Sequence, residues 1–241
     1  MIRYFNIFFV TLHAKMSFRF KQFTIGQDGC AMKVGTDGVL LGAWANGGSR
    51  VLDVGTGTGV IALMMAQRFP CAQVTALDID AGAVRQASEN ILAVGWQERI
   101  TVLHQSVQEY AQLSDSKGLF DAVVSNPPFF IHALNAPDAQ RNLARHADSL
   151  PYAALMEAAW HLLKTDGELS VVVPFDYRRR MEDEAIFRGF FLKRECAVKT
   201  TERKPARRYL LAFRKHPCVC DHKTLTIGDD RYQTLTRDFY L

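Results

Sequence analysis

Three glycines at alternate positions, directly after a short apolar run, restrict the fold of this chain more than any other feature. Arg50 to Val54 is typical of a buried strand, and Gly55, Gly57 and Gly59 follow it. The segment from Val60 to Phe69 then has the apolar pattern of a helix. A strand, a glycine turn and a helix in this order indicate an α/β fold in which a nucleotide lies over the turn and the helix N-terminus.

The rest of the chain continues this alternation of strand-like and helix-like segments. That pattern predicts a mainly parallel sheet covered by helices on both faces. Further strands are expected at residues 73–77, 100–103, 120–125, 168–173, 192–199 and 209–213, and further helices at residues 81–93, 150–164 and 176–189. There are no internal repeats and no low-complexity linker, so the 241 residues indicate one domain over residues 16–241.

The first residues carry an apolar run that is too short for a membrane span. Residues 5–12 are mostly apolar, whereas a helix that crosses a bilayer needs about 20 apolar residues. Arg3 is the only basic residue ahead of this run, so a secretory signal is not indicated. We interpret residues 1–15 as an extension upstream of the true start at Met16, with a membrane anchor as the weaker alternative.

Composition and charge indicate the surroundings and the kind of partner. Apolar residues make up 48% and charged residues 22%, as in globular proteins, and five scattered cysteines favour reduced thiols in the cytoplasm. Residues 1–175 carry 13 basic and 15 acidic side chains, whereas residues 176–241 carry 16 and 10, a net charge of +6. A basic end on a near-neutral body suits a polyanionic partner, although it also fits a merely solvated face.

The glycine spacing bears on which nucleotide is held. A dinucleotide fingerprint, Gly-x-Gly-x-x-Gly, requires its third glycine at the position where Val60 stands. Asp78, at the end of the next expected strand, is the acid that accepts hydrogen bonds from ribose hydroxyls. An adenosyl cofactor without a pyrophosphate, such as S-adenosylmethionine, fits better. Asp53 is then expected near the cofactor's amino group, unless it only caps the turn.

Asn126-Pro127-Pro128-Phe129, after the strand at residues 120–125, indicates the atom that receives chemistry. The exocyclic amino group of adenine is a poor nucleophile because its lone pair is delocalised into the ring. The Asn126 side-chain oxygen and the Pro127 carbonyl oxygen can accept hydrogen bonds from its two N–H groups and direct the lone pair out of the plane of the ring. Pro127 and Pro128 make the turn rigid, and Phe129 offers a face for the base to stack on. The four residues therefore predict methyl transfer to a planar nitrogen.

These motifs resemble the class I S-adenosylmethionine-dependent N6-adenine methyltransferases, and within them the bacterial tRNA1(Val) adenine-N6 methyltransferase family. The runs Phe20–Phe23 and Cys30–Trp44 and the ending Asp238–Leu241 carry the closer resemblance, which covers residues 18–241. It implies a Rossmann-like class I methyltransferase fold, with a seven-stranded mostly parallel sheet whose last strand is antiparallel. It further implies that segment 18–46 closes over S-adenosylmethionine, and that the acceptor is an adenine beside the anticodon of a tRNA.

The resemblance also implies which residues contact each ligand. The expected cofactor contacts are Lys33, Thr36, Asp37, Asp53, Gly55, Gly57, Gly59, Asp78, Ile79, Ser106 and Val107. Ser106 stands where this superfamily commonly has an aspartate, so its hydrogen bond to the cofactor lacks charge assistance. The expected contacts with RNA phosphates are Arg203, Lys204, Arg207 and Arg208. The expected assembly is a monomer or a weak dimer.

Three alternatives stay open from the sequence. One is methylation of a glutamine side chain in a release factor, which is also a planar amide-type nitrogen. Another is an RNA-binding protein that keeps the fold without catalysis, although Asp53, Asp78 and Asn126 are intact. The third is a metal site at His216, Cys218, Cys220 and His222. We expect no metal there, because alternate residues of a strand share one face by pleat geometry alone.

Overall fold

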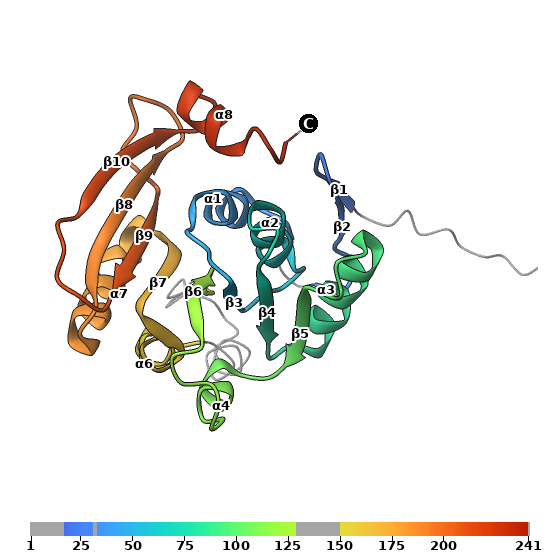
Figure 1. Ribbon diagram of the computed structural model, residues 1–241. Coiled ribbons are helices and arrows are strands. Elements are labelled where there is room, and N and C mark those ends of the chain that lie inside the picture. The colour runs from blue at the N-terminus through green and yellow to red at the C-terminus, as the bar shows by residue number, and fades with distance from the viewer. Residues whose placement is uncertain (1–16, 31–32, 129–149, 241) are drawn as a thin grey trace, which may run out of the picture.

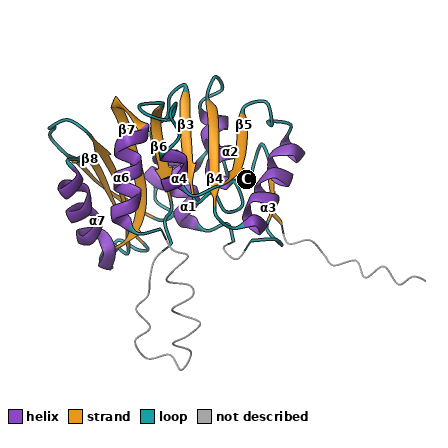
Figure 2. Cartoon of the chain, turned by 90° about the horizontal axis from the view of Figure 1, so that it is seen from below, coloured by secondary structure: helices purple, strands orange, loops and turns teal. Residues whose placement is uncertain are grey.

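The computed structural model describes residues 17–30, 33–128 and 150–240, and these form a central sheet with helices on both faces (Figures 1 and 2). The sheet has eight strands, in the order β10 (Asp221–Thr226), β8 (Phe191–Lys199), β9 (Arg208–Arg214), β7 (Leu163–Pro174), β6 (Phe120–Ser125), β3 (Arg50–Val54), β4 (Gln73–Asp78) and β5 (Ile100–His104). Strand β9 is antiparallel to both of its neighbours, and all the other pairs are parallel. A separate hairpin precedes the sheet, formed by β1 (Ser17–Arg19) and β2 (Thr24–Gly26).

The helices divide into two groups that bury two hydrophobic cores against the sheet. One face carries α1 (Thr36–Trp44), α2 (Val60–Arg68), α3 (Ala81–Val94) and α8 (Asp230–Thr236). The other face carries α4 (Val107–Ala111), α6 (Tyr152–Leu162) and α7 (Phe175–Arg188). The inner strands β3 and β6 are mostly apolar and mostly buried because helices cover them on both sides, as in parallel sheets generally.

The N-terminal segment 18–46 is built into the first of these cores. Helix α1, which the sequence did not predict, buries residues 38–43 and packs against α2. This packing is close at Gly42, where a Cβ atom would lie 2.8 Å from the Met64 sulfur. Phe20 of the same segment is buried together with Phe239, near the C-terminus. The expectation that this segment closes over a cofactor stays a prediction, as do the domain bounds.

The predicted fold class is confirmed, and the structure adds detail at its edges. Strand β10 is an eighth strand, beside β8, beyond the seven that were expected. The predicted helix 150–164 is wrong at its end, because α6 stops at Leu162 and β7 begins at Leu163 rather than at residue 168. The polar residues 164–166 lie in β7 before its register shift against β6, where they stay exposed. No helix of the described ranges is long and apolar enough to cross a membrane.

The strand order reverses between β3 and β6, and this is where open α/β sheets bind their ligands. From β3 the chain proceeds to β4 and β5 on one side, and β6 and β7 lie on the other side. Val54 and Ser125 are register partners, and the Ser125 hydroxyl donates to the Val54 carbonyl at 2.8 Å. The glycine turn after β3 and Asn126 after β6 therefore leave the sheet side by side.

Candidate active site

The turn after β3 is fastened to the end of β4. The N–H groups of Gly55 and Thr56 both donate to the Leu77 carbonyl at 2.9 Å. The Gly57 N–H donates to Asp78 Oδ2 at 2.8 Å, and Asp78 Oδ1 accepts from Asp80 N at 3.0 Å. Asp78 thus holds the turn with one oxygen, and each carboxylate oxygen keeps acceptor capacity for a ribose hydroxyl.

The three glycines serve two different purposes. Gly55 and Gly57 have φ values of +71° and +56°, and an added Cβ atom at either would meet nothing within 4 Å. Open space therefore lies over these two backbone units, as a bound nucleotide requires. Gly59, the N-cap of α2, has φ +81°, and its Cβ would lie 3.3 Å from Ala87 of α3. The third glycine therefore allows close packing of a helix and does not border the open space.

Asp53 lies in the sheet beneath this turn and is fully buried. Its Oδ2 accepts from the Thr56 hydroxyl at 2.6 Å and from Ala62 N, in the first turn of α2, at 3.1 Å. Asp53 therefore does cap the turn, one of the two roles considered from the sequence. Its Oδ1 is also buried and accepts no hydrogen bond from the described residues. Burial raises the pKa of Asp53 from 3.8 to about 7, and the negative charge of Asp78 adds to this.

This raised pKa predicts how stability depends on pH. Between 3.8 and about 7 the folded protein holds a proton on Asp53 more tightly than the unfolded chain does. The Asp53 contribution to the free energy of unfolding should therefore fall as pH rises through this window. Asp53→Asn, which cannot ionise, should lose this dependence and gain stability relative to the wild type at pH 8. Urea unfolding at pH 5 and pH 8 measures the free energy of unfolding of both proteins. An equal change in this free energy between the two pH values in the wild type and in Asp53→Asn would contradict the assignment.

Two side chains of α3 hold the N-terminal segment against the turn, and no motif in the sequence indicated either of them. The Asn90 amide accepts from Gly26 N at 2.8 Å, and it donates to the carbonyls of Gly26 at 2.8 Å and Thr58 at 2.9 Å. Gln86 accepts from Gly29 N at 2.9 Å. Asn90 thus joins the N-terminal hairpin directly to the glycine turn.

Cys30, which follows Gly29 in that segment, lies close enough to Asp78 and Asp80 to feel their charges. Burial, and then the charges of Asp78 and Asp80, raise the pKa of the Cys30 thiol to about 11. These charges act on Cys30 because the N-terminal segment passes beside the end of β4. The described part of this segment therefore borders the same site as the glycine turn.

Asn126 stands on the other side of the reversal point. Its side-chain Oδ1 is buried and has no hydrogen-bond partner among the described residues. Pro127 is buried and Pro128 half-buried, whereas Phe129 lies outside the described residues. A buried amide oxygen that accepts nothing is costly in a folded protein, and a ligand N–H group would satisfy it.

The other predicted cofactor residues have different surroundings. Ile79 is 51% exposed and offers an apolar surface directly after Asp78. Val107 is buried in the second core, and the Ser106 hydroxyl both accepts from Glu109 N and donates to the Glu109 carboxylate. This capping box was legible in the sequence as Ser106-x-x-Glu109 and gives Ser106 a structural role. Lys33 and Thr36 are exposed at the start of α1.

The predicted RNA-binding residues lie at the same edge of the sheet as this site. Residues 200–207 join the end of β8 to the start of β9, which is antiparallel to β7 and begins beside Pro174, at its carboxyl end. In this connection Arg203, Lys204 and Arg207 are exposed. Arg208 is half-buried, and its Nε donates to Asp37 Oδ2 at 2.7 Å. This ion pair joins a predicted RNA contact to a predicted cofactor contact.

The cysteines after β9 do not form a recognisable metal site. Cys220 Sγ lies 3.9 Å from His222 Nδ1, and Cys218 donates to the Leu192 carbonyl. Within the ranges that the structure describes, no three His, Cys, Asp or Glu side chains are grouped so that they could hold a metal ion.

The arrangement fits an adenosyl cofactor that carries positive charge. S-adenosylmethionine has an ammonium and a sulfonium group, and two acids lie next to the glycine turn: Asp78, which is bonded to Gly57 N, and Asp53, which is buried beneath the turn. The buried, unpartnered Asp53 oxygen is an acceptor directed at no protein donor in the described residues. An anionic pyrophosphate over the turn would be repelled by the Asp78 carboxylate, which disfavours a dinucleotide.

Comparison with known proteins gives the family. The family model of the methyltransferase small domain matches residues 34–202. A tRNA1(Val) (adenine(37)-N6)-methyltransferase from Bacteroides fragilis is 45% identical over 233 residues, which is 93% of this chain and 97% of that protein. A protein of the same name from Trichodesmium erythraeum is 42% identical and covers 93% of this chain and 97% of its own length. Another from Histophilus somni (strain 2336) is 41% identical and covers 94% of this chain and 98% of its own length.

Solved structures support the fold. A predicted O-methyltransferase from Agrobacterium tumefaciens superposes with a TM-score of 0.66 at 16% identity, covering 84% of this chain and 96% of that one. A putative class I S-adenosylmethionine-dependent methyltransferase from Listeria monocytogenes gives 0.58 at 18% identity, covering 82% and 65%. The chain therefore belongs to the methyltransferase small domain family and, within it, to the family of the relatives named tRNA1(Val) (adenine(37)-N6)-methyltransferase.

Proposed function

We propose that this methyltransferase transfers a methyl group from S-adenosylmethionine to N6 of an adenine beside the anticodon of a tRNA. The observation that carries the proposal is the buried Asn126 Oδ1, which lies next to the glycine turn and has no hydrogen-bond partner among the described residues. An adenine amino group has two N–H donors, one of which satisfies this oxygen. The names of the relatives, which specify adenine 37 of tRNA1(Val), support the choice of nucleotide.

The residues of the site perform three tasks in this reaction. The bound cofactor supplies the methyl group on a sulfonium. Asp53 would hold its amino group, and Asp78 would accept hydrogen bonds from its ribose hydroxyls. Asn126 Oδ1 and the Pro127 carbonyl oxygen accept hydrogen bonds from the two N–H groups of the adenine amino group. These bonds reduce the delocalisation of the nitrogen lone pair into the ring and direct it toward the methyl carbon. The product nitrogen then loses one proton to water, so no side chain has to act as a general base.

The basic connection between β8 and β9 provides the contact with the RNA backbone. The acids at the glycine turn attract the cationic cofactor and repel phosphate, so the RNA needs basic groups elsewhere at the same edge. Arg203, Lys204 and Arg207 are exposed there and meet this need. Arg208 takes part through the same connection, although its Nε is already bonded to Asp37.

The proposal is tested by asking which macromolecule is methylated. Labelled S-adenosylmethionine is incubated with the full chain and either total tRNA or a release factor, and the modified nucleoside or residue is identified by mass spectrometry. We expect label in tRNA as N6-methyladenine. Label in the glutamine of the release factor alone would overturn the assignment to RNA. No label in either substrate would favour a fold kept for binding without catalysis.

The same assay tests the basic connection. Arg203→Glu with Arg207→Glu should raise KM for tRNA at least about tenfold at low salt, and the difference from the wild type should shrink as salt rises, because salt weakens phosphate contacts that only the wild type makes. The KM for S-adenosylmethionine should not change. Arg19→Glu, an exposed charge reversal in β1, is the matched control. Equal KM values for tRNA in the variant and the control would mean that these arginines are only part of a solvated surface and do not contact the RNA.

A further inference from the structure

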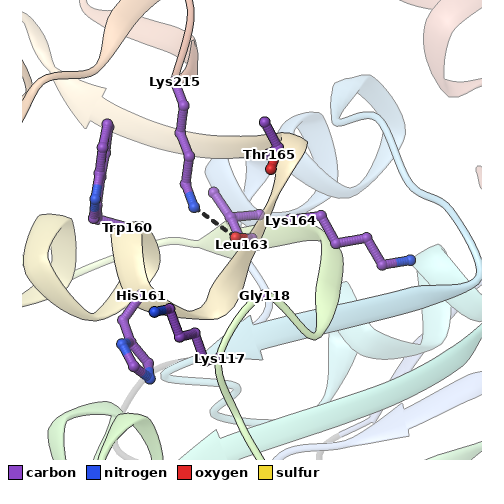
Figure 3. Close-up of a pocket in the computed structure, with 8 residues that line it drawn as sticks. All are labelled: Lys117, Gly118, Trp160, His161, Leu163, Lys164, Thr165 and Lys215. Carbon is purple, nitrogen blue, oxygen red and sulfur yellow. Dashed lines mark hydrogen bonds between the residues drawn. The ribbon is translucent and has the colours of Figure 1, made fainter.

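A pocket of about 460 Å³ lies at the edge of the sheet opposite to the candidate active site (Figure 3). It is formed by the start of β7, the end of α6, the segment before β6 and the segment after β9, and its lining residues are Lys117, Gly118, Trp160, His161, Leu163, Lys164, Thr165 and Lys215. Leu163 and Pro174 mark the two ends of β7, and a twelve-residue strand spans about 36 Å. The pocket is therefore separate from the site of methyl transfer.

Two of its three lysines have no negatively charged partner among the described residues. Lys164 pairs with Asp121 at 2.6 Å and is thus neutralised. Lys215 Nζ instead donates to the Leu163 carbonyl at 2.6 Å and lies 5.2 Å from the centre of the Trp160 ring. Among the described residues, no carboxylate lies within ion-pair distance of Lys117 or Lys215. Burial, and then the charge of Lys117, lower the pKa of Lys215, as expected for two cations that line one pocket.

The free donors of the pocket suit an anion with several acceptor oxygens. Lys215 retains two N–H donors after its bond to Leu163, and Lys117 adds a second ammonium group. The Thr165 hydroxyl and the His161 ring also line the space. Two ammonium groups without a counter-ion repel each other, and an anion bound between them removes this repulsion. The volume lies within the range of about 300–1,000 Å³ that is usual for small-molecule sites.

We propose that this pocket binds a phosphate group between Lys117 and Lys215. The group comes either from a small phosphorylated molecule or from the RNA backbone, and the chemistry of recognition is the same for both. The proposal does not depend on the proposed function, because phosphate binding can be measured without any methyl transfer.

The test is a titration of the full chain with sodium phosphate and with pyrophosphate at constant ionic strength, followed by thermal unfolding. We expect a saturable rise in Tm for the wild type, and Lys117→Gln with Lys215→Gln should raise the apparent Kd at least about tenfold. Lys223→Gln, which removes one exposed positive charge outside both the pocket and the candidate active site, should leave phosphate binding unchanged. Lys117→Gln alone, at an exposed residue, keeps the Lys215 bond to Leu163 and should still weaken binding several-fold.

A second titration, with tRNA, identifies the source of the phosphate. If the double lysine variant weakens tRNA binding as Lys204→Gln does, the ligand is the RNA backbone. If tRNA binding stays at the wild-type level while phosphate binding is lost, the ligand is a small molecule. The same phosphate dependence in the wild type and in the double variant would overturn the proposal, and so would a wild type without saturable binding.

Discussion

Asn126→Ala is expected to lower kcat for methyl transfer by about 100- to 1,000-fold, while the Kd for S-adenosylmethionine stays within a few-fold of the wild type. The variant removes the buried Oδ1 that has no partner among the described residues. The cofactor residues Asp53 and Asp78 are on neighbouring strands and are not altered. Single-turnover rates and calorimetric titration with the cofactor measure the two quantities separately.

Ser125→Ala is the control for this variant. Its hydroxyl is buried and donates to the Val54 carbonyl, so its loss should reduce stability and leave the acceptor oxygen in place. A fall in kcat that is equally large for Ser125→Ala and Asn126→Ala would mean that Asn126 acts by holding the strands together. Unchanged turnover in Asn126→Ala would remove it from the reaction.

Asn90→Ala is expected to lower the free energy of unfolding by about 2–4 kcal/mol and to weaken cofactor binding. The variant leaves the N–H and C=O groups of Gly26 and the Thr58 carbonyl without their partner in a buried region. It also separates the N-terminal hairpin from the glycine turn, so the turn is less well ordered before the cofactor binds.

Ser88→Ala, on the same helix, provides the comparison for Asn90→Ala. The Ser88 hydroxyl is exposed and bonds only to the carbonyl of Val84, one turn earlier in α3, so the change should cost less than about 0.5 kcal/mol. Denaturant unfolding and cofactor titration of both variants measure the difference. An Asn90→Ala protein that loses stability but binds the cofactor normally would show that Asn90 serves the fold alone.

Local sequence signals were sufficient for the centre of the fold. The apolar run at 50–54, the glycines and the acid at 78 predicted β3, the turn and the end of β4 because each signal lies within a few residues of the structure that it specifies. Helix α1 was missed, since Gly38 and Gly42 weaken its helical pattern. Tertiary packing overrides that weakness, because α1 is buried against α2.

The parts of the site that depend on distant residues were not predictable in the same way. The ion pair between Asp37 and Arg208 joins positions 171 residues apart, and the bond between Asn90 and Gly26 joins positions 64 apart. No periodicity or motif records such contacts. The position of Asn126 beside the turn did follow from the sequence, because parallel strands end at a common edge.

The reversed direction of β9 also affects how this family can diversify. Residues 200–207 close a hairpin between two neighbouring strands, whereas the connections that carry the glycine turn and Asn126 run between parallel strands. A hairpin connection tolerates insertions and deletions, because its two ends stay paired whatever its length. The surface that we propose for RNA contact can therefore change in length and sequence during evolution or engineering, while the glycine turn and Asn126 keep their positions.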